Sequence, residues 1–197
     1  MEGVNGHGKS TFMNLIYYGL GGRVQAFNKN DDNDSKKHNE IFYDTNNYVE
    51  LLIEIDDEKY ELTRYIGDNL IFVVGEDEEV RETCVLRNQS DEHTMVFSDW
   101  ILGKLNINVF DIVQGTRSFK LNFTDLLRLV YHDQETEVDK VYKEADNSNF
   151  LSDSLEIRKA IFEILLGKTY NDYYSTLGQY KLTMKELEKA QAVMDSY

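Results

Sequence analysis

Proline, cysteine and long apolar runs are scarce in this sequence of 197 residues. It contains no proline, where average usage predicts about ten, so no helix or strand is interrupted by that residue. The single Cys84 excludes a disulfide within the chain and a cysteine-based zinc site. We find no secretory signal, and no apolar run approaches the roughly 18 residues that a membrane helix requires. These absences lead us to expect a cytoplasmic protein without membrane contact.

The sequence also contains few positively charged residues. The chain has 21 Lys plus Arg against 36 Asp plus Glu, which gives a net charge of −15. A charge of that sign repels phosphate backbones, so the composition argues against a simple basic nucleic-acid binder. Any DNA contact would need a local basic patch or a partner. Hydrophobic residues make up 41% and aromatic residues 12%, which is typical of a folded domain, and the length suits one domain with a substantial core.

A phosphate-binding motif stands at the start of the chain. Gly3-Val-Asn-Gly-His-Gly-Lys-Ser10 matches the pattern G-x-x-x-x-G-K-[ST]. Successive backbone N–H groups have to curl around phosphate oxygens, and the three glycines of this motif allow that close approach. An apolar-faced helix is expected from Thr11 to Tyr18, with its positive N-terminal end aimed at the same anion. The motif therefore predicts nucleotide binding.

Each polar residue of this motif has an expected role. Lys9 would reach the β- and γ-phosphates, the Ser10 hydroxyl would ligate Mg²⁺, and the Thr11 hydroxyl would lie near the α-phosphate. The predicted cofactors are therefore ATP and Mg²⁺. The predicted nucleotide-binding residues are Gly3, Asn5, Gly6, His7, Gly8, Lys9, Ser10 and Thr11.

The motif lacks one usual neighbour. A phosphate loop normally follows a buried β-strand, and only Met1 and Glu2 precede Gly3. We therefore expect that the strand is supplied from elsewhere, or that the sequence is a fragment of a longer chain or a mis-started reading frame. A loop without its strand is poorly held, so we expect this chain alone to bind nucleotide weakly.

Alternating apolar residues after the first helix indicate a β-meander. A cluster of glycines at positions 19, 21 and 22 is expected to end that helix before the meander begins. The turn at Asp56 to Glu58 would join the first two strands as a hairpin. The expected segments are a charged loop over 26–40 and strands over 48–55, 59–66, 69–74 and 82–87.

A helical region follows the meander. Ser98 is expected to cap a short helix over 98–105, and Thr124 is expected to cap a second one over 122–131. A strong apolar face predicts a third helix over 154–166. The polar, acidic segment between the second and third helices is expected to be a loop.

The segment 170–197 carries largely apolar side chains at alternating three- and four-residue steps, the spacing of a heptad seam. Two interpretations are open: the start of a coiled coil, or an amphipathic helix packed on its own domain. The seam positions are Leu177, Tyr180, Met184, Leu187, Gln191 and Met194.

These features resemble the heads of ABC-type ATPases, in particular those of the SMC superfamily, which includes the SMC proteins, RecN and the double-strand-break repair ATPases. Gly3 to Thr11 is similar to the Walker A loop of that superfamily, and a β-meander with an arginine-bearing strand, Tyr60 to Arg64, follows it. The stretch Leu126 to Gln134 resembles the approach to the family's Q-loop. Ile157 to Leu166 is similar to the helix that leads into the coiled coil.

The resemblance implies an α/β P-loop NTPase lobe with a β-meander and a helical subdomain, and it implies roles for single residues. Gln134 would contact Mg²⁺ and the attacking water, which makes Lys9 and Gln134 the implied catalytic residues. The alternative Q-loop residue is Gln114, and Gln134 is preferred because the helix that leads to the coiled coil follows it at a suitable distance. Arg64 is interpreted as a surface arginine at a strand end rather than as an arginine near the nucleotide.

The resemblance stops short of a complete active site. In this family the signature motif, the Walker B aspartate with its catalytic glutamate, and the switch histidine belong to a C-terminal lobe, and we identify none of them in this sequence. We therefore expect residues 1–169 to be the N-terminal lobe, residues 170–197 to begin the coiled coil, and this chain alone to be inactive. The implied partners are the C-terminal lobe of the same protein, a second head in an ATP-dependent homodimer, and DNA.

Other sites and functions have less support in the sequence. The four histidines have no metal-ligand spacing, and Cys84, in a strand-like run, is expected to be buried. A P-loop kinase would need an arginine-rich lid, which is not visible. A non-catalytic nucleotide-sensing or scaffold protein, whose C-terminal helix docks on a partner, is the main alternative.

Overall fold

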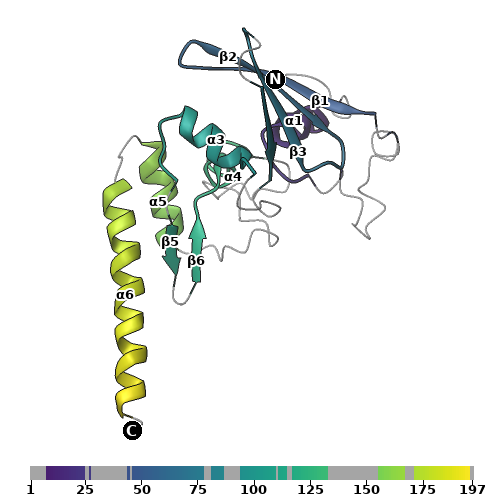
Figure 1. The fold of residues 1–197 in the computed structure, drawn as a ribbon. Coiled ribbons are helices and arrows are strands. Elements are labelled where there is room, and N and C mark those ends of the chain that lie inside the picture. Colours follow the sequence, from purple (N-terminus) through teal and green to yellow (C-terminus); the bar gives the residue numbers. More distant parts are fainter. Residues whose placement is uncertain are drawn as a thin grey trace.

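In the computed structural model the chain is α/β: a four-stranded antiparallel sheet lies at one end, and a long C-terminal helix extends from the other (Figure 1). The predicted loop residues Gly3, Asn5, Gly6 and His7, and the predicted Gln134, lie outside the described residues. The structure describes residues 8–24, 27, 44, 46–77, 81–86, 94–109, 111–114, 117–132, 155–166 and 171–195.

The first helix, α1 (Lys9–Gly19), confirms the helix expected after the motif. It ends in a Schellman motif, in which the Gly21 N–H donates to the Tyr18 carbonyl at 3.0 Å and the Gly22 N–H donates to the Tyr17 carbonyl at 2.9 Å. Gly21 has a φ of 85°, a left-handed conformation that glycine adopts without steric cost. The glycines after the helix therefore end it, as predicted.

The predicted β-meander is present as an antiparallel sheet in the order β1-β2-β3-β4. The first two strands form a hairpin through Asp56 and Asp57, whose φ angles of 50° and 67° are left-handed, as a tight hairpin turn requires. The turn is shorter than predicted, because Glu58 pairs with Ile55 and already belongs to the second strand. The strands are β1 (Tyr48–Ile55), β2 (Glu58–Tyr65), β3 (Leu70–Gly75) and β4 (Arg81–Val85).

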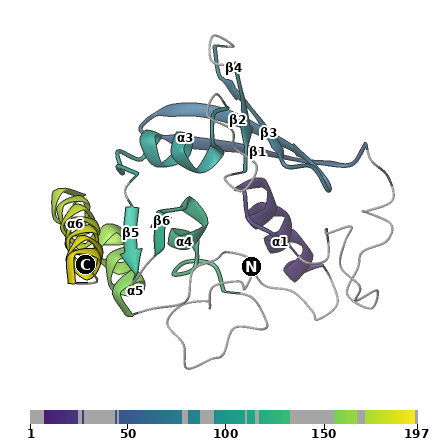
Figure 2. The same cartoon turned by 60° about the horizontal axis from the view of Figure 1, so that its bottom comes forward.

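Alternation of side chains gives the sheet one buried and one exposed face. Tyr60 and Leu62 of β2 lie on the buried face, together with Ile71 and Val73 of β3. The opposite face is open to solvent, as the 75% exposure of Leu52 shows. Figure 2 shows α1 below the sheet, where it packs against β1 and β2. The meander therefore supports α1, the helix whose first turn contains the last residues of the motif.

A second helix on the buried side, α3 (Phe97–Lys104), confirms the short helix predicted there. The predicted cap at Ser98 is wrong. The helix begins one residue earlier with Val96 as its N-cap, and the Ser98 hydroxyl accepts a hydrogen bond of 2.9 Å from the Phe123 N–H. This hydroxyl therefore joins α3 to the next helix instead of capping its own.

The next helix, α4 (Phe123–Leu127), is shorter than the predicted 122–131. The predicted cap at Thr124 is also wrong, because the N-cap is Asn122. The Asn122 side chain accepts a bond of 3.2 Å from the Thr124 N–H, and the Asp125 carboxylate accepts a bond of 3.0 Å from the Asn122 N–H. This reciprocal pair is a capping box, which satisfies two N–H groups at the helix start.

The remaining elements lie away from the sheet (Figure 1, Figure 2). A hairpin of β5 (Asp111–Gln114) and β6 (Arg117–Lys120) was not expected from the sequence, and its strand β5 contacts the C-terminal helix. The strong helix expected before the C-terminal segment is present as α5 (Leu155–Leu165). Its Ile161 and Ile164 are buried in the main core, which ties α5 to the rest of the fold.

The last described element is α6 (Asn171–Asp195), a single helix that runs away from the sheet (Figure 1). Tyr180, Met184, Leu187 and Met194, all on the predicted seam, are exposed by 38–76%. The described part of the chain therefore leaves these four side chains uncovered, whereas Leu177 on the same seam is partly buried and α6 contacts β5. Both interpretations stay open. The coiled coil stays a prediction.

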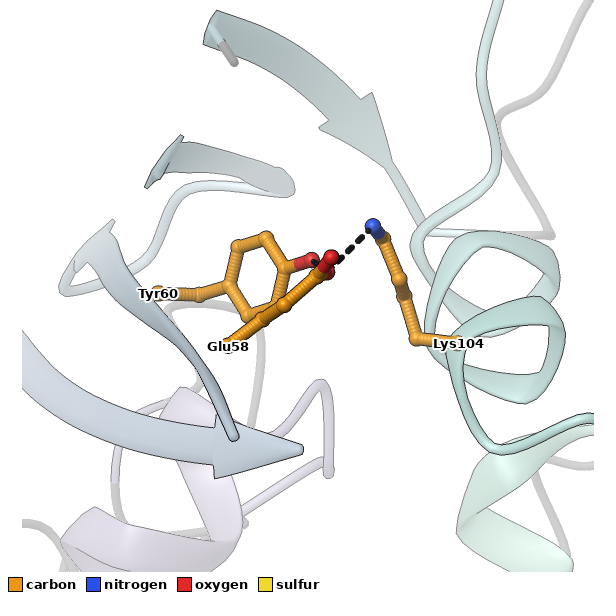
Figure 3. A network of polar contacts seen from close by, with 3 residues as sticks. All are labelled: Glu58, Tyr60 and Lys104. Atoms are coloured by element: carbon orange, nitrogen blue, oxygen red, sulfur yellow. Dashed lines mark hydrogen bonds and ion pairs between the residues drawn. The ribbon is translucent and has the colours of Figure 1, made fainter. Parts of the chain in front are cut away.

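A polar cluster fastens the start of β2 to the end of α3 (Figure 3). The Tyr60 hydroxyl donates to the Glu58 carboxylate, and the Lys104 ammonium lies 3.2 Å from the same carboxylate and 4.8 Å from the centre of the Tyr60 ring. These two donors, the hydroxyl first and the ammonium second, lower the pKa of the Glu58 carboxyl from its usual 4.5. The cluster is therefore a clamp between sheet and helix.

This clamp predicts a specific acid sensitivity. Because the native pKa is lowered, the Glu58 carboxylate stabilises the fold fully above pH 4.5 and loses that contribution as the pH falls through the lowered value. We expect the melting temperatures of the wild type and Glu58→Gln to differ at neutral pH and to converge in acid. Thermal denaturation over a pH series measures this, with Glu50→Gln as the control for removing one exposed charge. A difference that persists unchanged in acid would contradict the clamp.

Candidate functional site

The described end of the predicted phosphate loop is the N-terminus of α1. Gly8 is the N-cap of this helix and has a φ of 75°, a left-handed conformation in which an L side chain is strained. The first helical hydrogen bond runs from the Phe12 N–H to the Gly8 carbonyl at 2.9 Å. The N–H groups of Ser10 and Thr11 therefore lie at the positive end of the helix, outside its hydrogen-bond ladder.

Among the described residues, the first turn of this helix is at least partly exposed and contains no acidic side chain. Ser10 is exposed, Lys9 and Thr11 are partly exposed, and no acidic residue lies in the first turn. An anion at this end meets N–H, hydroxyl and ammonium groups. These donors fit a polyphosphate, and the Ser10 hydroxyl is an oxygen ligand of the kind that Mg²⁺ takes. The structure therefore brings Gly8, Lys9, Ser10 and Thr11 together at one helix terminus.

The structure describes only one of the two candidate Q-loop residues. Gln134 lies outside the described residues, so its role stays a prediction. Gln114, the alternative, is the last residue of β5 and pairs with Arg117 in the hairpin next to α6. In both views this hairpin and α1 lie on opposite sides of α4 (Figure 1, Figure 2).

Arg64, interpreted from the sequence as a surface arginine, is buried, with 4% of its area exposed. Its guanidinium donates to the Tyr18 carbonyl at 2.7 Å and to the Gly22 carbonyl at 2.9 Å, at the C-terminal end of α1. It also donates to the Asp68 carbonyl at 3.2 Å and lies 3.7 Å from the centre of the Tyr18 ring. The surface interpretation is wrong because Arg64 is on the buried face of β2, beneath the end of α1.

This arginine acts on the end of α1 opposite to the phosphate loop. A helix of 11 residues spans about 16 Å, which separates the guanidinium from the helix N-terminus. A cation at the C-terminal end complements the negative pole of the helix dipole. The Tyr18 hydroxyl adds to this anchor, because it donates to the Tyr65 carbonyl at 2.7 Å and accepts from the Gly67 N–H at 2.9 Å. Arg64 therefore anchors the helix that begins with the motif.

A second anchor holds the middle of α1. The Tyr131 ring stacks on the Tyr17 ring, with centroids 4.5 Å apart and planes inclined by 14°, and the Tyr131 hydroxyl donates to the Asn14 side-chain oxygen. Tyr131 is 6% exposed and lies just after α4. No local pattern in the sequence indicates this contact, since Asn14 and Tyr131 are 117 residues apart.

Cys84 is fully buried in β4, as predicted. Burial, with a smaller contribution from Glu82, raises the pKa of the Cys84 thiol to about 12. Because the thiolate is the reactive species, we expect no reaction with an aromatic disulfide reagent in the folded protein and complete reaction in denaturant. The absorbance of the released aromatic thiolate measures this reaction. Rapid labelling of the folded chain would contradict the burial.

The described residues form neither a metal-binding cluster nor a membrane-spanning helix. Within the part of the chain that the structure describes, no three His, Cys, Asp or Glu side chains are grouped so that they could hold a metal ion. No helix among the described residues is long and apolar enough to cross a membrane. The N-terminus of α1 is therefore the candidate site that the described residues support.

A family model described as an AAA domain matches residues 1–196, almost the entire chain. No curated protein and no solved structure matches the chain.

Proposed function

The chain belongs to the AAA domain family, and from that premise we propose that it binds Mg-ATP through Gly3 to Thr11, as the N-terminal half of an SMC-like ATPase head. Membership of the family supports a nucleotide-binding, ATPase-type function, in which Mg²⁺ usually accompanies the nucleotide. The finer assignment to an SMC-like head is supported by the resemblance of the motif and by the order of helix, meander and helical region.

The observation that carries this proposal is the junction at Gly8. A left-handed glycine there leads directly into α1, and Lys9 and Ser10 follow in the first turn of that helix. Phosphate oxygens accept hydrogen bonds from N–H groups at a helix N-terminus, a lysine ammonium neutralises their charge, and a hydroxyl can ligate Mg²⁺. The motif supplies the residue types, and the helix supplies their arrangement.

For the whole protein, the proposal is ATP hydrolysis that drives conformational change on DNA, in repair, chromosome maintenance or phage defence. Gln134 would contact Mg²⁺ and the attacking water, while Lys9 holds the phosphates. The C-terminal lobe of the same protein would supply the remaining catalytic groups, and two heads would close on ATP. The exposed seam of α6 is consistent with a partner helix in a coiled coil.

Calorimetric titration of this chain with ATP, ADP and AMP, each with and without Mg²⁺, tests the proposal. We expect the affinity to fall from ATP to ADP to AMP, because each phosphate that is removed takes charge-assisted hydrogen bonds with it. We also expect weaker ATP binding when Mg²⁺ is chelated. No binding of any nucleotide, or equal binding of all three, would contradict the proposal.

Two further assays separate the rival functions. Transfer of phosphate from ATP to an added small-molecule acceptor would support a P-loop kinase. For the full-length protein, ATP-dependent dimerisation without turnover would support a non-catalytic scaffold, whereas turnover would support the ATPase.

A further inference from the structure

One tyrosine joins the helix that begins with the motif to the helical region. Tyr131 follows α4 in the chain and is buried against α1, where its ring stacks on Tyr17 and its hydroxyl donates to Asn14. Asn14 lies about 8 Å along the helix axis from Lys9. Tyr131 therefore holds α1 close to the end at which the phosphates are expected.

The same tyrosine is fixed to α4. The Tyr131 N–H donates to the Leu127 carbonyl at 2.7 Å, so the backbone at Tyr131 is bonded to the last residue of that helix. Leu126 of α4 shares the main core with Ile161 of α5. A continuous series of packed contacts therefore leads from α1 through Tyr131 and α4 to α5.

The contact between α4 and α5 is incomplete. A pocket of about 260 Å³ lies between the two helices, and Arg128, Leu129, Arg158 and Phe162 are among its lining residues. Space at a helix interface removes packing contacts, so the shared core around Leu126 and Ile161 has to carry any coupling between α4 and α5. The contact of Tyr131 with α1, by contrast, is stacked, hydrogen-bonded and buried.

We propose that Tyr131 is a positioning residue that transmits the ordering of α1 by bound Mg-ATP to α4, and through α4 to α5. This inference rests on the proposed nucleotide site. Phosphates bound at the N-terminus fix the first turn of α1, and the contacts with Tyr17 and Asn14 make Tyr131 follow any displacement of that helix. Tyr131 also lies three residues before Gln134, the predicted Q-loop residue, in the sequence.

Hydrogen exchange of the full chain, measured by mass spectrometry with and without saturating Mg-ATP, tests this role. In the wild type we expect the α5 amides to exchange about fivefold more slowly with nucleotide bound, which is the lower end of typical coupling between sites. Tyr131→Phe keeps the ring and removes the hydroxyl, so the ratio of α5 exchange rates without and with nucleotide should fall below the wild-type value. Tyr131→Leu removes the stacking as well, so the ratio should approach one while nucleotide titration still shows binding.

A matched control and a structural readout separate the outcomes. Tyr48→Phe makes the same change at an exposed tyrosine on the sheet and should keep the full ratio. A merely structural role of Tyr131 would speed α5 exchange in both states and leave the ratio unchanged. The inference alone is overturned if the wild type binds nucleotide without slower α5 exchange, or if both Tyr131 variants keep the wild-type ratio. Absence of nucleotide binding by the wild type overturns the proposed function as well.

Discussion

Replacing Arg64 with leucine should lower the free energy of unfolding by about 2–4 kcal/mol. The substitution removes the buried donor groups that bind the Tyr18, Gly22 and Asp68 carbonyls, and buried acceptors that lose their donors are costly. The loss is smaller than three full hydrogen bonds, because the Tyr18 carbonyl keeps a bond from the Gly21 N–H. The effect is large because total stabilities are typically about 5–15 kcal/mol.

Thermal denaturation measures this loss, which corresponds to a melting temperature about 5–15 °C lower for a chain of this size. Arg64→Lys keeps the charge but not the planar fork of donors. Its melting temperature should therefore lie between those of the wild type and Arg64→Leu. Arg23→Leu changes an exposed arginine just beyond α1 and is the matched control. An equal loss in Arg23→Leu and Arg64→Leu would contradict the anchor.

Replacing Lys9 with alanine should weaken Mg-ATP binding about 10- to 150-fold, the equivalent of about 1.5–3 kcal/mol for a hydrogen bond to a charged group. The fold should be unaffected, because Lys9 is partly exposed at the first position of α1 and alanine is the best helix former. Titration calorimetry of the two proteins measures the change in affinity, and circular dichroism measures the fold.

Two companion variants make this result specific. Lys120→Ala removes an exposed lysine at the end of β6 and should leave the affinity unchanged. Ser10→Ala should reduce the gain in affinity that Mg²⁺ brings more than it reduces binding of metal-free ATP. Equal Mg-ATP affinity of the wild type and Lys9→Ala would contradict the role assigned to the lysine.

Much of the secondary structure could be predicted because its causes are local. The alternation of apolar residues over 48–66 predicts two strands, and the acidic turn between them predicts a hairpin, which the structure confirms. The glycines after α1 predict its end, because only a residue that tolerates a left-handed φ closes a Schellman motif there. Periodicity also predicts α5, whose position differs from the expected one by a single residue at each end.

The helix caps show where local reasoning is insufficient. Ser98 and Thr124 are both good capping residues, yet neither caps its helix. The Ser98 hydroxyl accepts a hydrogen bond from the Phe123 N–H, a partner on another helix. At α4, Asn122 wins over Thr124 because Asp125 completes a reciprocal pair with it.

The anchors of α1 could not be predicted because they are made across the fold. Arg64 contacts carbonyls 42 and 46 residues away, and the hydroxyl of Tyr131 reaches an oxygen 117 residues away. From the sequence alone, an arginine in a strand is interpreted as a surface residue. Its burial becomes clear only from the packing of α1 on the buried face of the sheet. For the candidate site, the motif predicted the residue types, and the structure adds the placement of Gly8 to Thr11 at a helix end.

We expect this chain to bind the phosphates of Mg-ATP at the start of α1. The most direct test is a two-dimensional ¹⁵N–¹H NMR titration of the chain with Mg-ATP, which reports on each backbone N–H group. We predict that the largest chemical-shift changes occur in residues 3–11, with Gly8, Lys9 and Ser10 among them, and that they are lost in Lys9→Ala. Changes centred elsewhere in the chain, or identical changes in Lys9→Ala, would contradict the account.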